Sequence, residues 1–126
     1  MNNKKRTVLV VDDETNIREL IKDNLEEENY RVFTANDGLS ALDMVDKHKP
    51  DLVILDIMMP EMDGWEVCKT IRDRGEEIKI LMLTAKSSSR DRMIGKSILN
   101  ADMYMTKPFD IEELISETGH LLDVHE

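Results

Sequence analysis

DLVILDIMMPEMDGWEV, residues 51–67, is the stretch that decides the fold of this chain. Residues 51–55 predict a buried strand, because a short, continuous apolar run rich in branched residues is typical of strands that are covered on both faces. Asp56 follows this strand directly, and two methionines and a proline come next. A carboxylate that follows an apolar strand with neither a helix cap nor a tight turn needs a separate explanation.

Strand patterns of the same kind recur along the chain and alternate with helical patterns. We predict strands at 7–11, 31–35, 51–55, 78–85 and 102–106, and helices at 15–28, 37–49, about 65–75, 90–99 and 110–124. Leu20 and Leu39 are among the residues that we assign to the apolar faces of the first two helices. Five strand–helix units in sequence predict an α/β domain with a parallel sheet, right-handed crossovers and helices on both faces.

Length and composition limit the class of protein. The chain has 126 residues, of which 40% are hydrophobic and 35% charged, enough for one compact domain. No apolar run is long enough to span a bilayer, so we expect no membrane insertion. The single Cys68 excludes an internal disulfide and fits a reducing cytoplasm. A net charge of −10 opposes direct binding to nucleic-acid phosphates.

Polar side chains stand where the predicted strands end. Asp12 and Asp13 follow the first strand, Asp56 the third, Thr84 lies at the end of the fourth, and Lys107 follows the fifth. Functional groups of parallel α/β sheets collect beyond the carboxyl ends of the strands. We therefore expect three carboxylates, a hydroxyl and an ammonium group to converge on one edge of the sheet.

Three close carboxylates repel one another, and a hard divalent cation with oxygen ligands relieves this repulsion, which favours Mg²⁺. A carboxylate beside Mg²⁺ can act as a nucleophile towards phosphorus. Lys107 and the Thr84 hydroxyl could then bind phosphoryl oxygens, and a backbone carbonyl of the loop after Asp56, at Met58, could serve as a metal ligand.

Four motifs in this sequence resemble those of one known family. VLVVDDE (8–14), DLVILDIMMPEMDGWEV (51–67), LMLTA (81–85) and YMTKPF (104–109) have the order and spacing of the receiver domain of bacterial and archaeal two-component response regulators. The resemblance covers about residues 6–123 and predicts a single receiver domain over residues 1–126. It implies a flavodoxin-like, doubly wound sheet of five parallel strands in the order 2-1-3-4-5.

The resemblance also implies a role for each residue of the acidic site. Asp56 corresponds to the residue that accepts the phosphoryl group. Asp13 corresponds to the direct Mg²⁺ ligand, Asp12 to the acid that holds the metal through water, and the Met58 carbonyl to the backbone ligand.

The remaining motif residues resemble parts of the family's switch. Thr84 and Lys107 correspond to the residues that bind the phosphoryl group, and Tyr104 to the aromatic residue that swings inward when the threonine moves. Pro108 corresponds to a proline that follows a cis peptide bond, and Gly64 fits a tight turn into the third helix.

The family's function follows as an expectation. A histidine kinase or histidine phosphotransfer protein would donate the phosphoryl group to Asp56. The surface of the fourth helix, fifth strand and fifth helix would then change and bind a downstream protein, until hydrolysis resets the switch. The acidic end of the last helix lacks the arginines with which DNA-binding members dimerise. The absence of a linker or output domain favours a single-domain regulator over a receiver cut from a longer protein.

Three other functions are weighed against this one. A phosphatase of the haloacid dehalogenase type would place its nucleophile after the first strand in a D-x-D-x-T pattern, but Glu14 stands where its second aspartate belongs. A flavodoxin-like binding module would need a first loop that accepts phosphate, and Asp12, Asp13 and Glu14 would repel one. A degenerate receiver that binds partners without phosphorylation would not need the complete acidic set and Lys107.

Overall fold

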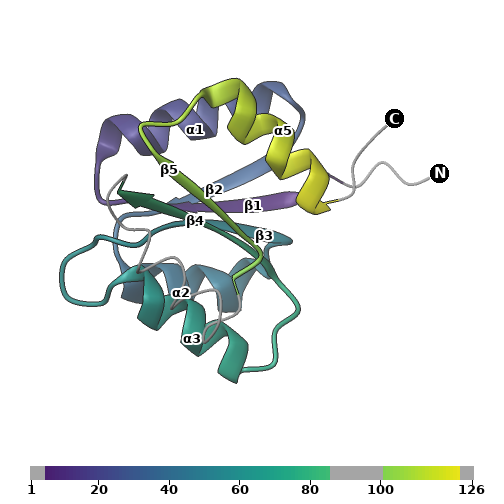
Figure 1. Ribbon diagram of the computed structural model, residues 1–126. Coiled ribbons are helices and arrows are strands. Elements are labelled where there is room, and N and C mark those ends of the chain that lie inside the picture. The colour runs from purple at the N-terminus through teal and green to yellow at the C-terminus, as the bar shows by residue number, and fades with distance from the viewer. Residues whose placement is uncertain (1–4, 86–100, 123–126) are drawn as a thin grey trace.

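The computed structural model describes residues 5–85 and 101–122, which form one five-stranded parallel sheet between two layers of helices (Figure 1). The strands are β1 (Thr7–Val11), β2 (Arg31–Ala35), β3 (Leu52–Asp56), β4 (Lys79–Ala85) and β5 (Met103–Lys107). Their order in the sheet is β2-β1-β3-β4-β5, and all neighbouring pairs are parallel. The predicted doubly wound, flavodoxin-like architecture is confirmed.

Helices cover both faces of the sheet. The described helices are α1 (Thr15–Glu27), α2 (Gly38–His48), α3 (Gly64–Asp73) and α5 (Ile111–Leu122). Figure 1 shows α1 and α5 on one face and α2 and α3 on the other. The helix predicted at 90–99 lies outside the described residues. Within the described ranges, no helix has the combination of length and hydropathy that crossing a bilayer requires.

The core has two parts because successive residues of a strand point to opposite faces of the sheet. Val8 and Val10 pack with α1 and α5, whereas Leu9 and Val11 pack with α2 and α3. All five residues of β3 are buried, including Asp56 at its end. The apolar run that predicted a strand covered on both faces therefore occupies the centre of the sheet.

The assignment of Leu20 and Leu39 to buried helical faces is wrong. Leu20 is 44% exposed and Leu39 is 66% exposed. In α2 the buried positions start at Gly38, because Met62 of the β3–α3 loop lies so close that a Cβ at residue 38 would stand 2.8 Å from it. Leu39, one residue further along, is rotated by about 100° towards solvent.

Close backbone packing holds the loop between β3 and α3 beside the end of β3. The Gly64 amide donates to the Ile57 carbonyl at 3.0 Å, and a Cβ at residue 64 would lie only 2.5 Å from the Asp56 carbonyl oxygen. The Asp63 side chain caps α3 by accepting from the Glu66 amide at 3.1 Å. The predicted tight turn at Gly64 is therefore a place where the absence of a side chain is required.

Candidate functional site

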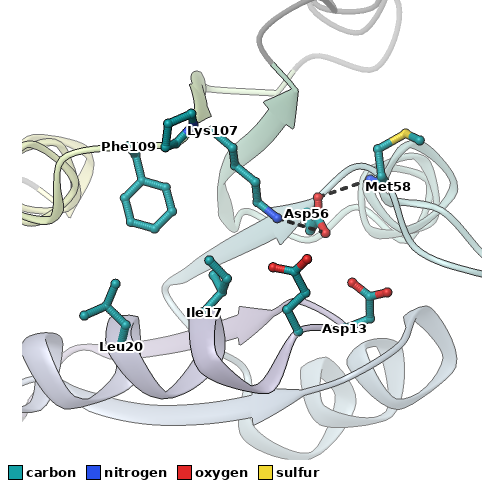
Figure 2. A pocket seen from close by; sticks show the side chains of 9 residues that line it. Asp13, Ile17, Leu20, Asp56, Met58, Lys107 and Phe109 are labelled. Atoms are coloured by element: carbon teal, nitrogen blue, oxygen red, sulfur yellow. Dashed lines mark hydrogen bonds and ion pairs between the residues drawn. The ribbon is translucent and has the colours of Figure 1, made fainter.

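The carboxyl ends of β1, β3 and β5 bring four of the predicted site residues together. Asp12 and Asp13 follow β1, Asp56 is the last residue of β3, and Lys107 is the last residue of β5. Figure 2 shows Asp13, Asp56 and Lys107 directed towards a common space. The four residues meet there because β1 and β3 are neighbours in the sheet and the lysine side chain reaches across from β5.

The three carboxylates form a group that could hold a metal ion. Asp12, Asp13 and Asp56 each offer an oxygen, and these oxygens lie within 4.8 Å of one another. Asp12 and Asp56 are buried, whereas Asp13 is exposed and leaves an opening towards solvent. A set of carboxylate oxygens with room for water suits Mg²⁺, which keeps several waters when it binds to proteins. The residues therefore fit the predicted cation.

Lys107 supplies the positive charge of the described site. Its ammonium nitrogen lies 2.9 Å from Asp12 Oδ2 and 3.2 Å from Asp56 Oδ2. Burial lowers the pKa of Lys107, but the hydrogen bonds and charges of Asp12 and Asp56 more than offset this effect and raise it. Lys107 therefore remains protonated and bridges the two buried carboxylates, from a position where it could also contact a phosphoryl oxygen.

The Asp56 carboxyl has an unusual protonation equilibrium. Only 3% of this residue is exposed, and burial is the main reason that its pKa rises from 3.8 to about 6. The negative charge of Asp12 acts in the same direction, while Lys107 and the Met58 amide oppose the rise. Asp56 is thus mostly ionised at neutral pH, although its ionised form is costly.

The turn between β1 and α1 is held by contacts that the sequence did not reveal. Asp12 Oδ1 accepts a hydrogen bond from the Glu14 amide at 2.9 Å, and the Arg18 guanidinium donates to the Asp12 carbonyl at 2.8 Å. The N-cap residue of α1 is Glu14, whose side chain makes no capping hydrogen bond. Arg18 looks like an ordinary charged residue of an amphipathic helix, so no signal in the sequence marks its role.

Met58 contacts the acidic site through its backbone. Its amide donates to Asp56 Oδ1 (Figure 2) at 3.2 Å, and the residue is 65% exposed. The amide and Lys107 together orient the Asp56 carboxylate, with one oxygen bonded to each. The use of the Met58 carbonyl as a metal ligand stays a prediction.

Thr84 lies on β4 and Tyr104 on β5. Thr84 is buried and follows Leu83, the Cα partner of Asp56 on β4. The Tyr104 hydroxyl is buried and has no hydrogen-bond partner among the described residues, and burial raises its pKa to about 12. The Tyr104 ring lies 6.3 Å from that of Trp65. The peptide bond between Lys107 and Pro108 is cis, as the resemblance implied.

A cavity of about 650 Å³ opens next to the carboxylates. One end is lined by Asp13, Asp56 and Lys107, and the other by apolar side chains that include Ile17, Leu20 and Phe109 (Figure 2). Leu20, which we expected in the core, lines this cavity. The fold and the site together define a domain of the doubly wound α/β class with an acidic pocket able to bind a metal.

Comparison with known proteins identifies the family. The family described as "Response regulator receiver domain" matches residues 8–118. Response regulator MprA of Mycobacterium sp. (strain KMS) is 44% identical over 115 residues, which are 91% of this chain and 50% of that protein. The chain thus spans about half the length of the curated relatives that it matches.

Solved structures agree with this match. The chemotaxis protein CheY4 of Vibrio cholerae is 34% identical, with a TM-score of 0.87, over 94% of this chain and 99% of that one. A receiver domain described as BeF3-activated DrrB is 31% identical, with a TM-score of 0.86, over 95% of this chain and 99% of that one. The chain belongs to the response regulator receiver domain family, whose members are switches of two-component signalling, and accepting a phosphoryl group is typical of this family.

Proposed function

We propose that Asp56 is the phosphoacceptor of this receiver domain and that residues 1–126 form a single such domain. The observation that carries the proposal is the buried Asp56 carboxylate, bonded by Lys107 and the Met58 amide, beside two further acids at the mouth of a cavity. An ionised carboxylate that is oriented and reached from solvent has the features of a nucleophile.

Mg²⁺ is the proposed cofactor. Asp13 and Asp56 would bind it directly with the Met58 carbonyl, and Asp12 would hold it through water. When bound, the ion neutralises negative charge on the carboxylates and on the phosphoryl oxygens. Asp12 and Asp56 support this assignment because they are buried with a single described cation, Lys107, between them.

In the proposed reaction, an oxygen of Asp56 attacks the phosphorus atom of the donor. A bond forms between that oxygen and phosphorus, and the bond from phosphorus to the donor's nitrogen or oxygen breaks, its electron pair leaving with the donor. The Lys107 ammonium group would keep one hydrogen bond to a carboxylate of the site and donate another to a phosphoryl oxygen. Thr84 would donate its hydroxyl to a second phosphoryl oxygen.

The phosphorylated state would act as a switch. Movement of Thr84 towards the phosphoryl group would change the position of Tyr104 and the surface of β5 and α5, together with the fourth helix expected at 90–99, which lies outside the described residues. Hydrolysis of the acyl phosphate would reset the domain, which would thus catalyse only its own phosphorylation and dephosphorylation.

The proposed donors are a sensor histidine kinase or a histidine phosphotransfer protein in the cytoplasm, and the proposed output is binding to a downstream protein. The domain itself would not bind nucleic acid directly, because its net charge is −10. Where the chain is part of a longer protein of the length of MprA, further segments would determine the output.

Intact-mass spectrometry after incubation with acetyl phosphate tests the acceptor. We expect one phosphoryl adduct on the wild-type chain in Mg²⁺, none in EDTA and none on Asp56→Asn. Asp23→Asn, on the exposed side of α1, is the matched control and should be phosphorylated normally. An adduct that persists on Asp56→Asn would show that another residue is the nucleophile. Lack of any adduct on the wild-type chain, with Mg²⁺ binding shown separately, would favour a receiver that works without phosphorylation.

A second experiment tests the switch. DrrB is described as BeF3-activated, so beryllium fluoride is a suitable stand-in for the phosphoryl group. Trp65 is the sole tryptophan and its ring lies near Tyr104. We expect beryllium fluoride with Mg²⁺ to change Trp65 emission, and Tyr104→Ala or Thr84→Ala to reduce the change. An undiminished change in both variants would contradict their proposed roles.

A further inference from the structure

A partly exposed apolar surface lies on the face of the molecule that carries α2 and α3. It consists of exposed Leu39 in the first turn of α2, exposed Met58 and half-buried Met62 in the β3–α3 loop, and half-buried Trp65 in the first turn of α3, and we call it the methionine face. Leu39 and Met58 are the two most exposed large hydrophobic residues among those described, at 66% and 65%. The proposed phosphoryl chemistry uses none of these four side chains.

Two cavities hollow this face. The larger has a volume of about 460 Å³ and is lined by Ile57, Met58, Met59, Asp63 and Trp65. The smaller, of about 180 Å³, is lined by Asp37, Gly38, Leu39, Pro60, Glu61, Met62 and Glu66. The β3–α3 loop contributes residues to both cavities, and each could receive an apolar side chain of a partner.

Acidic side chains surround the methionine face. Asp37, Glu61, Asp63 and Glu66 line the two cavities, and no lysine or arginine is among the described residues that line them. The side chains of Glu61 and Glu66 are exposed and have no ion pair within the described part of the chain. The face thus combines apolar anchoring sites with a surplus of acidic side chains among the described residues, which favours a partner of opposite charge.

The backbone under this face is preformed. Met62 packs against Gly38 and the loop ends at the tightly packed Gly64, so two close contacts hold it. Asp37 and Asp63 cap α2 and α3 by accepting from the Ser40 and Glu66 amides. Unbranched methionine side chains on a firm backbone can adjust to different apolar partners without loss of the underlying fold.

We propose that the methionine face binds a cationic amphipathic segment of another protein. Its apolar side chains would enter the two cavities, and its lysine or arginine side chains would pair with Glu61 and Glu66. A second copy of this chain is a poor occupant, because each copy has a net charge of −10. Binding needs neither metal nor phosphorylation, so the proposal stands or falls separately from the role of Asp56.

Trp65 gives a direct measurement, since this sole tryptophan lines the larger cavity. The probe is a synthetic helical peptide of about 14 residues of leucine and lysine, the length at which a helical segment presents one apolar face. Titration into the unphosphorylated protein in EDTA is expected to change Trp65 emission saturably. A peptide with glutamate in place of lysine, and one with serine in place of leucine, should not bind.

Matched variants locate the binding. We expect Leu39→Gln to lower the affinity for the leucine–lysine peptide about tenfold, which is the size of effect expected for an anchoring side chain at an interface. Leu20→Gln removes the exposed leucine on α1, which lines neither of the two cavities of the methionine face, and should leave the affinity within about twofold, as a residue outside the interface should. The double variant Glu61→Gln/Glu66→Gln should bind the peptide with lower affinity, and this affinity should depend less on salt concentration. The control variant Glu19→Gln/Asp23→Asn should show neither change.

Several outcomes would overturn the proposal. Equal losses of peptide affinity in the Leu20 and Leu39 variants would show that the peptide binds outside the methionine face. Binding of the leucine-free peptide with the same affinity would show that only general attraction between opposite charges holds it. Sedimentation measurements without peptide supply a further test. Dimerisation that Leu39→Gln abolishes would show that the face binds a second copy and not a cationic partner.

Discussion

Asp56 shows how its surroundings change the chemistry of one residue. Burial and the neighbouring charge of Asp12 raise the pKa of its carboxyl to about 6 in the folded chain, from 3.8 when unperturbed. The folded state therefore favours the protonated form, and ionised Asp56 destabilises the fold. The penalty is absent below the unfolded pKa, grows between 3.8 and about 6, and is complete above that range.

We expect Asp56→Asn to stabilise the metal-free protein, because asparagine removes the ionisation penalty. A shift of about two pKa units corresponds to a gain on the order of 3 kcal/mol at pH 8. Urea unfolding of both proteins in EDTA should show the gain at pH 8 and lose most of it at pH 4. Asp23→Asn, which alters an exposed aspartate, should show no such pH dependence. A gain that is the same at both pH values would contradict the assigned cause.

Lys107→Met should have the opposite effect, since it leaves two buried carboxylates without their shared cation. Removal of one partner from a largely buried ion pair costs about 3 kcal/mol. We expect this loss in urea unfolding at pH 8 in EDTA, and partial recovery in Mg²⁺. Lys69→Met, which breaks an exposed pair with Asp73 on α3, should cause no measurable loss. Equal stability of the two variants would show that Lys107 does not stabilise the metal-free site.

At the scale of elements, the junction from β3 to α3 connects the sheet to the site. Asp56 ends β3, the Ile57 amide still donates to Leu83 of β4, and the Gly64 amide returns to the Ile57 carbonyl. The loop therefore leaves the sheet at Asp56 and comes back to the same point before α3 begins. This closed path keeps the Met58 amide within hydrogen-bonding distance of Asp56.

Gly64→Ala should disrupt this junction, because the new Cβ would meet the Asp56 carbonyl oxygen at 2.5 Å and the Ile57 Cα at 2.8 Å. Both contacts are backbone atoms that cannot rotate away, so we expect a loss of about 2 kcal/mol or more in the free energy of unfolding. Mg²⁺ affinity should fall as well. Gly75→Ala is the control: its φ is 74° but nothing lies within 4 Å, so only the left-handed strain of about 1 kcal/mol is expected. A loss no larger than in this control would argue against the close packing at Gly64.

At the scale of the whole molecule, the domain has a net charge of −10 and concentrates three acids at one edge of its sheet. A cation that binds only the folded state shifts the folding equilibrium towards it. We expect Mg²⁺ at about a hundred times its dissociation constant to stabilise the wild-type chain by roughly 2.7 kcal/mol. Thermal unfolding measures this gain.

Asp13→Asn separates specific binding from screening in that experiment, because it removes the exposed member of the three acids. The variant should lose most of the gain with Mg²⁺. Sodium chloride at the same ionic strength should stabilise the wild-type and variant proteins equally, and by less than Mg²⁺ stabilises the wild-type chain. A Mg²⁺ effect that sodium chloride reproduces in full would mean that the acids do not form a metal site.

The sequence by itself determined the order of the strands and of the helices that the structure describes, and the position of the acidic site. Strand bounds agree within one residue, because each strand is a short apolar run bounded by polar residues. The edge on which Asp12, Asp56 and Lys107 meet followed from the rule that parallel strands end on the same side. The strand order came from resemblance to a family and is confirmed by the sheet.

Only the tertiary structure decided which side chains pair and which stay exposed. Periodicity placed Leu39 with Leu42, but the approach of Met62 makes Gly38 the buried residue and turns Leu39 to solvent. The bridge from Lys107 to Asp12 joins residues 95 positions apart, and the bond from Arg18 to the Asp12 carbonyl depends on the path of one turn. A pattern along a chain reports which face a residue prefers, whereas contacts depend on how faces meet in space.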